Sequence, residues 1–315
     1  MKSIKVSCVV VTYNRLSLLK ECIAAVRKQT FQPDTIYIVN NHSTDNTEEY
    51  LATFADDAQM RIISLPENVG GAGGFSQGIK EAVLAGADWV WIMDDDTIPE
   101  EDALEKLVAA THLTKKVGYV CSKVLWLDGT PHLSNKASIC IEKGNISYNS
   151  YSTKEVPALL STNATFVSVM INSDAVRELG LPISEFFIWM DDIEYTVRIA
   201  THGYDCFYVD NSHVLHKTAE NYFSRPDMAP VETAWKFYYQ ARNVAYMKRK
   251  NRGKLALFFS TLNMYRVYLH RINKRKDHNK SLFRKHIWKG CWDSLKFNPT
   301  IEFLPVTDKE RSAEK

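Results

Sequence analysis

Short apolar runs alternate with amphipathic stretches through the first hundred residues, and this alternation predicts strands joined by helices. The apolar runs are too short for typical helices and rich in β-branched residues, so each predicts a buried strand. The predicted strands are Lys5–Val11, Thr35–Val39, Arg61–Leu65 and the run that begins at Trp89, and the predicted helices are Leu18–Lys28 with Ser17 as N-cap, a helix from Asp45 onward, and Ile79–Ala87. This order is typical of a parallel sheet with helices on both faces, so we expect an α/β fold.

The pattern becomes less regular after residue 110 and changes again after Arg225-Pro226. Predicted strands are Val117–Leu127, Ala137–Ile146, Ala164–Ile171 and Tyr204–Val209, and predicted helices are Pro99–Ala109, Ala175–Leu179 capped by Asn172, and a helix from Asp191. Beyond residue 225 two helices are predicted, Thr233–Lys250 and Lys254–Lys274. We therefore divide the chain into a domain of residues 1–225 and a helical region of residues 226–315.

Three consecutive carboxylates, Asp94, Asp95 and Asp96, follow directly on the strand that begins at Trp89. They repel one another, and a hard divalent cation such as Mg²⁺ or Mn²⁺, which takes oxygen ligands, would neutralise them. In open α/β sheets, ligands bind at the carboxyl ends of strands, where this cluster is expected. The alternative is a solvated loop whose carboxylates favour the start of the next helix through its dipole.

A second acidic pair, Asp191 and Asp192, opens an amphipathic helix and follows the aromatic residues Phe186, Phe187 and Trp189. Carboxylates are stabilised at a helix N-terminus, which is one explanation of the pair. The other is a general base beside a partly apolar pocket. His216 follows the next strand; it is either structural or the nitrogen ligand that completes a metal site with the acidic clusters.

The loops after the first three strands are polar and should gather at the same sheet edge. Tyr13 offers a flat face for a base, while Asn41 and Asp45 offer hydrogen-bond partners. The glycine-rich segment from Glu67 to Gly78 would let the backbone approach a ligand, although ordinary turn chemistry also explains such loops. The segment matches neither the dinucleotide-binding pattern nor a P-loop.

Composition is ordinary for a folded protein of 315 residues, with 45% hydrophobic and 24% charged residues. The six cysteines show no metal-ligand spacing, which fits reduced thiols in the cytosol. The first residues lack the pattern of a signal peptide, and no window approaches the roughly 18 apolar residues of a membrane span. We therefore expect a cytoplasmic protein.

Charge is distributed unevenly, although the net charge is only +2. Between Lys236 and Lys296 there are seventeen lysines and arginines against two acids, Asp277 and Asp293, so the rest of the chain is acidic. Aromatic residues lie among these bases: Trp235, Tyr238, Tyr239, Tyr246, Phe258, Phe259, Tyr265 and Tyr268. Such a segment suits a membrane surface or a nucleic acid, or it packs on the first domain with its charges solvated.

Taken together, residues 6–216 resemble the inverting nucleotide-sugar glycosyltransferases of family 2, which have the GT-A fold. The resemblance is carried by Val-Val-Val-Thr-Tyr-Asn-Arg15, Ile-Val-Asn-Asn-His-Ser-Thr-Asp45, Met-Asp-Asp-Asp96 and Trp-Met-Asp-Asp-Ile-Glu-Tyr-Thr-Val-Arg198. Asn and His stand where Asp and Gly are common in the second motif. Glu-Asn-Val-Gly-Gly-Ala-Gly-Gly-Phe75, the spacing Phe-Ile-x-x-Asp-Asp192 and the late His216 are closer to bacterial galactofuranosyltransferases and their rhamnosyltransferase relatives.

This resemblance implies a role for each motif residue. Uridine would be held by Thr12, Tyr13, Arg15 and Asn41; the donor sugar and diphosphate would lie at Gly73, Gly74, Asp94 and Asp95; Asp96 and His216 would bind Mn²⁺ or Mg²⁺; and Asp192, or alternatively Asp191, would be the general base. One base opposite the leaving group gives a single displacement with inversion.

The sequence therefore predicts a metal-dependent glycosyltransferase that moves galactofuranose from UDP-galactofuranose to a lipid-linked or polysaccharide acceptor in bacterial surface-glycan synthesis. The alternatives are a dTDP-rhamnose-dependent rhamnosyltransferase and a sugar-nucleotide-binding protein without turnover. On such a protein the basic helices favour an anionic membrane surface over nucleic acid, so we expect a peripheral position at the inner face of the cell membrane.

Overall fold

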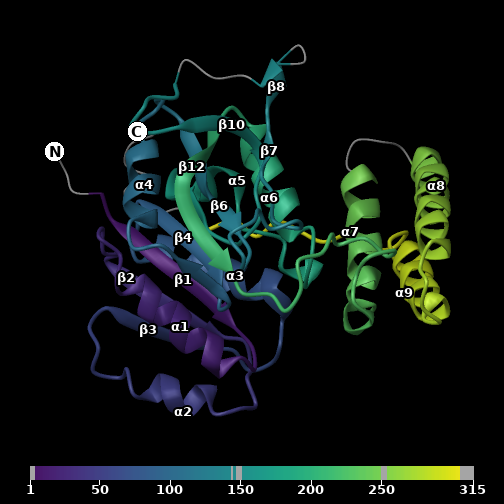
Figure 1. The fold of residues 1–315 in the computed structure, drawn as a ribbon, viewed down its shortest axis with the longest axis horizontal. Coiled ribbons are helices and arrows are strands. Elements are labelled where there is room, and N and C mark those ends of the chain that lie inside the picture. Colours follow the sequence, from purple (N-terminus) through teal and green to yellow (C-terminus); the bar gives the residue numbers. More distant parts are fainter. Residues whose placement is uncertain (1–3, 143–144, 147–150, 250–253, 306–315) are drawn as a thin grey trace.

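The computed structural model describes residues 4–142, 145–146, 151–249 and 254–305. One large mixed sheet has the strand order β3-β2-β1-β4-β11-β6-β12-β10-β7, with β5 paired to the end of β12 (Figure 1). Its strands are β1 Val6–Thr12, β2 Thr35–Asn40, β3 Met60–Ser64, β4 Trp89–Asp94, β5 Thr97–Pro99, β6 Val117–Leu125, β7 Ser138–Ile139, β10 Ala158–Asn163, β11 Val169–Asn172 and β12 Asp205–His216; β8 Ile141–Glu142 and β9 Asn145–Ile146 form a separate hairpin.

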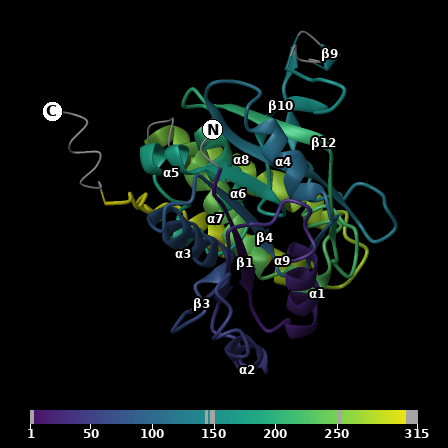
Figure 2. The same ribbon diagram turned by 90° about the vertical axis from the view of Figure 1, so that its left-hand side faces the viewer.

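Helices cover both faces of this sheet and form a lobe beside it (Figures 1 and 2). They are α1 Leu16–Val26, α2 Thr47–Ala52, α3 Gly70–Leu84, α4 Ala103–Ala110, α5 Ser173–Leu179, α6 Asp191–Ala200, α7 Lys236–Arg249, α8 Lys254–Asn273 and α9 Lys280–Asp293, with short 3₁₀ turns at Ser184–Phe186 and Val231–Thr233. The predicted α/β fold with helices on both faces and a C-terminal helical region is confirmed.

Alternate side chains of β1 explain why the sheet needs helices on both sides. Val9 and Val11 lie in one core with Phe75 and Ile79 of α3. Cys8 and Val10 point to the opposite core with Leu19 of α1 and residues of α4. Every residue of β1 is buried, as the continuous apolar run predicts for a central parallel strand.

Helix α3 corrects the prediction for the glycine-rich segment. It begins at Gly70 and not at Ile79, so the glycines lie within a helix and do not form a turn. A Cβ atom on Gly74 would lie 2.6 Å from Cγ1 of Val11, and one on Gly78 would lie 2.3 Å from Cγ1 of Val9. The glycines therefore allow α3 to approach β1 closely, which lowers local helix propensity but gains packing on the strand.

Several predicted boundaries also differ from the structure. Helix α1 begins at Leu16 without a side-chain cap from Ser17; the Leu16 amide instead donates to Asp45, 3.4 Å away on the loop after β2. Helix α4 begins only at Ala103, because Thr97–Pro99 pairs with β12. The predicted strand Ala164–Ile171 is wrong in extent: β10 ends at Asn163, and β11 starts at Val169. Asn172 caps α5 as predicted, accepting a hydrogen bond from the Asp174 amide.

The region after residue 225 contains three helices in its described part, one more than predicted. The predicted helices correspond to α7 and α8, while α9 was not predicted. Some predicted positions lie outside the described residues. They are Lys250 at the end of the predicted helix Thr233–Lys250, residues 143–144 within the predicted strand Ala137–Ile146, residues 147–150 after that strand, and residues 306–315. None of the helices in the described ranges combines the length and apolar character required to cross a bilayer.

Candidate active site

Three neighbouring parallel strands end together at one edge of the sheet. Val11 of β1 is in register with Asp94 of β4, and Thr12 is in register with Asn40 of β2. The loops that follow β1 and β2 are bound to each other: the Asn14 amide donates to the Ser43 hydroxyl over 3.0 Å, and the Thr44 amide donates to the Asn14 side chain over 2.6 Å. As predicted, the loops after β1 and β2 therefore lie together at the carboxyl edge of the sheet.

The turn after β4 is fixed from the loop after β1. The Thr12 hydroxyl donates to Asp95 over 2.7 Å, and Arg15 forms ion pairs with Asp95 at 2.7 Å and with Asp96 at 2.6 Å. Asp95 is fully buried, and burial, opposed by Arg15, raises the pKa of its carboxyl group to about 7. Thr12 and Asp95 are therefore engaged with the protein itself, and their contact with a donor remains a prediction.

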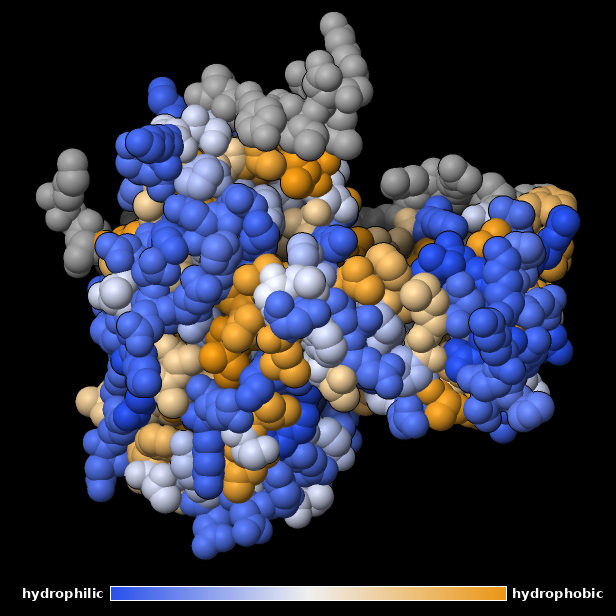
Figure 3. All heavy atoms as spheres, in the orientation of Figure 1, coloured by the Kyte–Doolittle hydropathy of each residue, from blue (hydrophilic) through white to orange (hydrophobic). Residues whose placement is uncertain are grey.

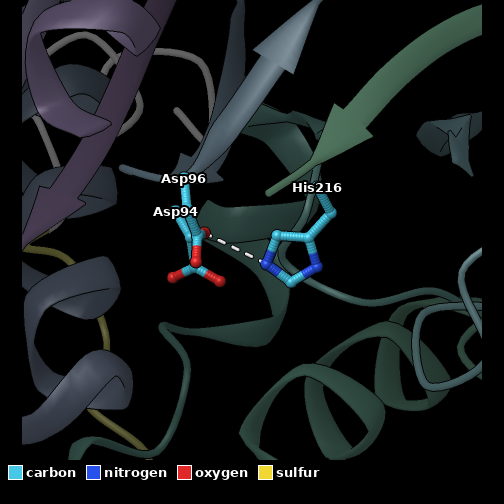
Figure 4. Close-up of side chains that lie close together, drawn as sticks. All are labelled: Asp94, Asp96 and His216. Carbon is cyan, nitrogen blue, oxygen red and sulfur yellow. Dashed lines mark hydrogen bonds and ion pairs between the residues drawn. The ribbon is translucent and has the colours of Figure 1, made fainter. Parts of the chain in front are cut away.

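Asp94, Asp96 and His216 converge on one point (Figure 4). Each offers one ligand atom, and these three atoms lie within 4.8 Å of one another. The imidazole comes from the end of β12, where Nε2 of His216 is 3.0 Å from Oδ1 of Asp96 and Nδ1 is 3.0 Å from Oδ1 of Asn135. Asn135 thus orients the ring that faces the carboxylates.

Asp94, Asp96 and His216 each change the pKa of another member of the group. Burial opposes ionisation of Asp96, yet His216 and Arg15 together hold its pKa below the usual value. Burial alone would lower the pKa of His216, but the carboxylates of Asp96 and Asp94 raise it. Burial, followed by repulsion from Asp96, raises the pKa of Asp94 to about 6. Carboxylates packed this closely repel one another, and a bound cation would offset that repulsion.

The donor set fits Mn²⁺ or Mg²⁺ in its chemistry. Two carboxylates and one imidazole suit Mn²⁺, and the carboxylates suit Mg²⁺. The resemblance predicts Asp96 and His216 as ligands and a contact of Asp94 with the ribose or the donor sugar; in the structure an oxygen of Asp94 lies in the same group of possible ligand atoms as Asp96 and His216. A predicted metal site at this sheet edge is therefore supported in position, and the identity of the ion remains a prediction.

The second acidic pair lies at the start of α6, within electrostatic reach of Asp94. Burial raises the pKa of Asp192 to about 7, partly opposed by the Ile193 amide, and Asp94 raises it further. Burial, Asp192 and Asp94 all raise the pKa of Asp191. Two acidic groups separated by almost one hundred residues in the sequence therefore act on each other in the folded chain.

The loop that delivers this pair has an unusual backbone. Phe187, Trp189 and Met190 all have positive φ angles, of 65°, 62° and 73°. Non-glycine residues rarely adopt such angles, and when they do the surrounding structure must hold them. The sequence offered no signal of this strain, because no glycine marks the loop.

Two distant helices hold the loop in place. The Ala72 amide at the start of α3 donates to the Phe187 carbonyl over 3.1 Å, and a Cβ atom on Gly70 would lie 2.0 Å from that carbonyl oxygen. On the other side the side chain of Asn243, fully buried in α7, donates to the carbonyls of Phe186 and Trp189 over 3.0 and 2.9 Å. The ring of Phe187 also stacks on Tyr239 of α7 at 4.8 Å.

Lys236, the first residue of α7, is a site residue that sequence reasoning missed. Its ammonium group lies 5.7 Å from the ring centres of both Trp189 and Trp235. Burial and then Arg15 lower the pKa of Lys236, while Asp94 and Asp96 oppose that shift, so the lysine shares the electrostatic environment of the acidic cluster. In the sequence it was counted only as one charge of the basic region, because nothing local distinguishes it.

The other predicted donor-binding residues have structural contacts of their own. Asn41 is buried; its amide group donates to Asn68 and to the Gly70 carbonyl, and its oxygen accepts from the Val69 amide. Gly73 and Gly74 lie in the first turns of α3, where a Cβ atom on Gly73 would lie 2.5 Å from Cγ2 of Val69. Tyr13 is 41% exposed and free of such packing. The donor-binding roles of these residues remain predictions.

Comparison with known sequences identifies relatives of this chain. The family described as Glycosyl transferase family 2 matches residues 7–179. Galactofuranosyltransferase GlfT1 of Mycolicibacterium smegmatis is 28% identical over 202 residues, which cover 63% of this chain and 66% of the relative, just under two thirds of its length. Poly-beta-1,6-N-acetyl-D-glucosamine synthase of Staphylococcus aureus is 30% identical over 138 residues, covering 44% of this chain and 31% of the relative.

Solved structures give the same fold. GalNAc-T7 crystallised with UDP, GalNAc and Mn²⁺ superposes with a TM-score of 0.58 at 15% identity, covering 79% of this chain and 51% of that chain. Residues 1–349 of TarS from S. aureus in complex with UDP superpose with a TM-score of 0.52 at 15% identity, covering 93% of this chain and 89% of that chain. The predicted GT-A fold and the predicted resemblance to family 2 are confirmed.

Proposed function

Because the chain belongs to glycosyl transferase family 2, we propose that it transfers galactofuranose from UDP-galactofuranose, with inversion, to a lipid-linked or polysaccharide acceptor of a bacterial surface glycan. The relative named galactofuranosyltransferase GlfT1 supports the sugar, and the TarS structure in complex with UDP supports a uridine nucleotide. The observation that carries the proposal is the group formed by Asp94, Asp96 and His216, with the acidic pair of Asp191 and Asp192 near enough for Asp94 to raise the pKa of both.

The general base of the reaction is Asp192, with Asp191 as the alternative. An acceptor hydroxyl is too weakly acidic to attack unaided, and a carboxylate that takes its proton contributes about 10²–10⁴-fold to the rate. Asp192 suits this role because its raised pKa, about 7, is close to neutral pH, where a base is both available and strong. Asp191 is the more deeply buried of the two, which leaves its carboxylate less accessible to an acceptor.

The leaving nucleotide diphosphate requires positive charge nearby. Asp94, Asp96 and His216 would hold Mn²⁺ or Mg²⁺, which when bound neutralises charge on the diphosphate. Arg15, anchored by Asp95 and Asp96, and Lys236 at the start of α7 supply fixed positive charge beside the same group. Trp189 and Trp235 flank Lys236 and limit the positions that its flexible side chain adopts.

The proposed acceptor also gives the basic helical region a role. A lipid-linked saccharide is held at a membrane, and the lysines and arginines of residues 236–296 favour an anionic surface there. We therefore include in the proposal a peripheral association with the inner face of the cell membrane.

Release of UDP from UDP-galactofuranose is the direct test of this function. The full chain is incubated with the donor and Mn²⁺, with and without a lipid-linked saccharide acceptor. We expect turnover that Asp192→Asn reduces by at least about a hundredfold while donor binding, measured by thermal shift, persists. Asp56→Asn, an exposed carboxylate remote in sequence from both acidic clusters, serves as the matched control and should retain wild-type turnover.

The same experiment separates the alternatives. Turnover with dTDP-rhamnose in place of UDP-galactofuranose would assign the chain to rhamnosyl transfer. Donor binding without turnover of either sugar, under every divalent metal, would show a sugar-nucleotide-binding protein and would refute the proposed activity.

A further inference from the structure

Helices α8 and α9 leave a group of large apolar side chains on their outer surface. Trp288 and Trp292 of α9 are 51% and 61% exposed, their rings stack at 6.4 Å, and Trp288 also contacts Tyr265 of α8 at 4.9 Å. Phe258 and Phe259 of α8 are both more than half exposed, and their rings contact each other. We call these five residues the outer aromatic surface.

Apart from Tyr265, which is partly buried against the core of the lobe, this surface is separate from the one with which the two helices build that core. Met264 and Ile272 of α8 and Phe283 and Ile287 of α9 are buried together with Phe237 and Ala241 of α7. The tryptophans therefore contribute little to the packing of the lobe, and two neighbouring exposed tryptophans are unusual unless something covers them.

Positive charge accompanies the aromatic rings on the same face of α9. Lys285, Trp288, Lys289 and Trp292 follow the spacing i, i+3, i+4 and i+7, so they form one stripe along the helix, and all four are exposed. The ammonium group of Lys289 lies 5.4 Å from the ring centre of Tyr238, so this lysine is at the edge of the stripe nearest α7. The acidic residue of this helix, Asp293, accepts a hydrogen bond from Tyr238 of α7 over 2.9 Å and is thus turned toward the lobe. Blue, hydrophilic side chains dominate the α8–α9 lobe on the face seen in Figure 3.

We propose that the outer aromatic surface and the lysines of α9 dock on an anionic lipid bilayer. Indole rings prefer the boundary between lipid chains and water, and lysine stems extend along apolar surface while their ammonium groups reach anionic headgroups. A second copy of the chain fits less well, because a symmetric contact through this face would place the same lysines opposite one another. The inference rests on the proposed function, which requires a membrane-bound acceptor.

The docking surface is connected directly to the candidate active site through α7. Helix α9 packs so closely on α7 that a Cβ atom on Gly290 would lie 2.2 Å from the Tyr238 carbonyl oxygen. The same α7 carries Asn243, which holds the loop before Asp191, and Lys236. Binding of α9 to a bilayer would therefore place the site at a fixed distance from the lipid surface.

Sedimentation with vesicles tests this inference in the full chain. We compare vesicles of phosphatidylcholine mixed with phosphatidylglycerol with vesicles of phosphatidylcholine alone. The variants are Lys285→Glu/Lys289→Glu and Trp288→Ser/Trp292→Ser. The control Lys28→Glu/Lys115→Glu makes the same charge change at exposed positions outside the helical lobe. Because each basic residue near an anionic surface contributes about 1 kcal/mol, reversing the two α9 lysines should weaken binding about tenfold or more.

The expected result is binding to the anionic vesicles only, its loss in both α9 variants, and its retention in the control. Equal binding of wild type and both α9 variants would overturn the inference. So would a concentration-dependent dimer that the tryptophan variant abolishes while no vesicle binding is seen, because the occupant would then be a second copy. Release of UDP without vesicles should be the same in all variants, which separates failure of docking from failure of the proposed transfer activity.

Discussion

Replacement of Asn243 by alanine tests whether the helical region holds the loop before Asp191 in its strained form. The side chain is fully buried and donates to the carbonyls of Phe186 and Trp189 over 3.0 and 2.9 Å, and to that of Ile188 over 3.4 Å. Alanine removes these donors, while the Phe186 carbonyl keeps the Ile188 amide at 2.7 Å. Loss of the donor to the Trp189 carbonyl costs about 1–3 kcal/mol and loss of the bond to Phe186 adds about 1 kcal/mol, so the free energy of unfolding should fall by about 2–4 kcal/mol.

The activity should fall as well, and for a separate reason. The three positive φ angles at Phe187, Trp189 and Met190 cost about 1–3 kcal/mol each, which the surrounding contacts must offset. Without Asn243 the loop can relax toward ordinary angles, and Asp191 and Asp192, which follow directly, move with it. A displacement of about 1 Å at a catalytic group reduces turnover by up to about a hundredfold, so we expect kcat to fall at least about tenfold.

Urea unfolding followed by circular dichroism measures the first effect, and release of UDP measures the second. Gln240→Ala is the matched control, since Gln240 lies one turn earlier on α7 and bonds to Ser224 and Tyr268, not to the loop. The control should lose about 1 kcal/mol and retain kcat. Asn243 does not hold the loop if Asn243→Ala unfolds at the same urea concentration as the wild type, or if the variant loses stability while kcat stays within twofold.

Four further predictions follow from single residues. Burial and Asp94 raise the pKa of Asp192 to about 7, and a base must be ionised, so kcat/KM should rise about tenfold per pH unit below pH 7 and level off above it. A flat profile of kcat/KM against pH would exclude Asp192 as the base. Because the raised pKa exceeds the unfolded value of 3.8, the contribution of Asp192 to the free energy of unfolding should decrease from about pH 4 to about pH 7. His216 must lose its proton to ligate a metal, so Mn²⁺ affinity should increase with pH and calorimetry in two buffers should show proton release that His216→Gln reduces, the remainder coming from Asp94, whose pKa burial and repulsion from Asp96 raise to about 6. Gly74→Ala should destabilise the protein by about 1–3 kcal/mol through contact with Val11, whereas Gly71→Ala, whose Cβ atom meets only Phe75 at 3.9 Å, should be neutral or stabilising in the same urea titration. Lys236→Met should reduce kcat for the natural donor with little effect on unfolding, and unchanged turnover would exclude it from the site.

The sheet and the acidic clusters could be predicted because their signals are local. A continuous β-branched run such as β1 predicts a buried strand, and three adjacent carboxylates at the end of β4 favour a positive charge beside them. His216 is marked in the sequence by its position after the predicted strand Tyr204–Val209, although the structure extends this strand to His216 itself as β12. Its partner Asn135 is not marked, because a single asparagine on a loop resembles many others.

Features that depend on distant contacts could not be predicted. The glycines of α3 indicate a turn by composition, and only the neighbouring β1 valines show that they permit close packing of a helix. Asn243 and Lys236 act on residues more than forty positions away, so no spacing in the sequence marks them. The positive φ angles at Phe187, Trp189 and Met190 are similarly invisible, since the residues that impose them lie in α3 and α7.

The contacts that hold the loop before Asp191 have a consequence for how the protein folds during synthesis. Helix α3, on one side of the loop, is synthesised early, whereas Asn243, on the other side, emerges more than fifty residues after the loop itself. A nascent chain can therefore complete its sheet and collect Asp94, Asp96 and His216 while the acid pair is still unsupported from the α7 side. The proposed base Asp192 gains its support from Asn243 only when α7 has left the ribosome.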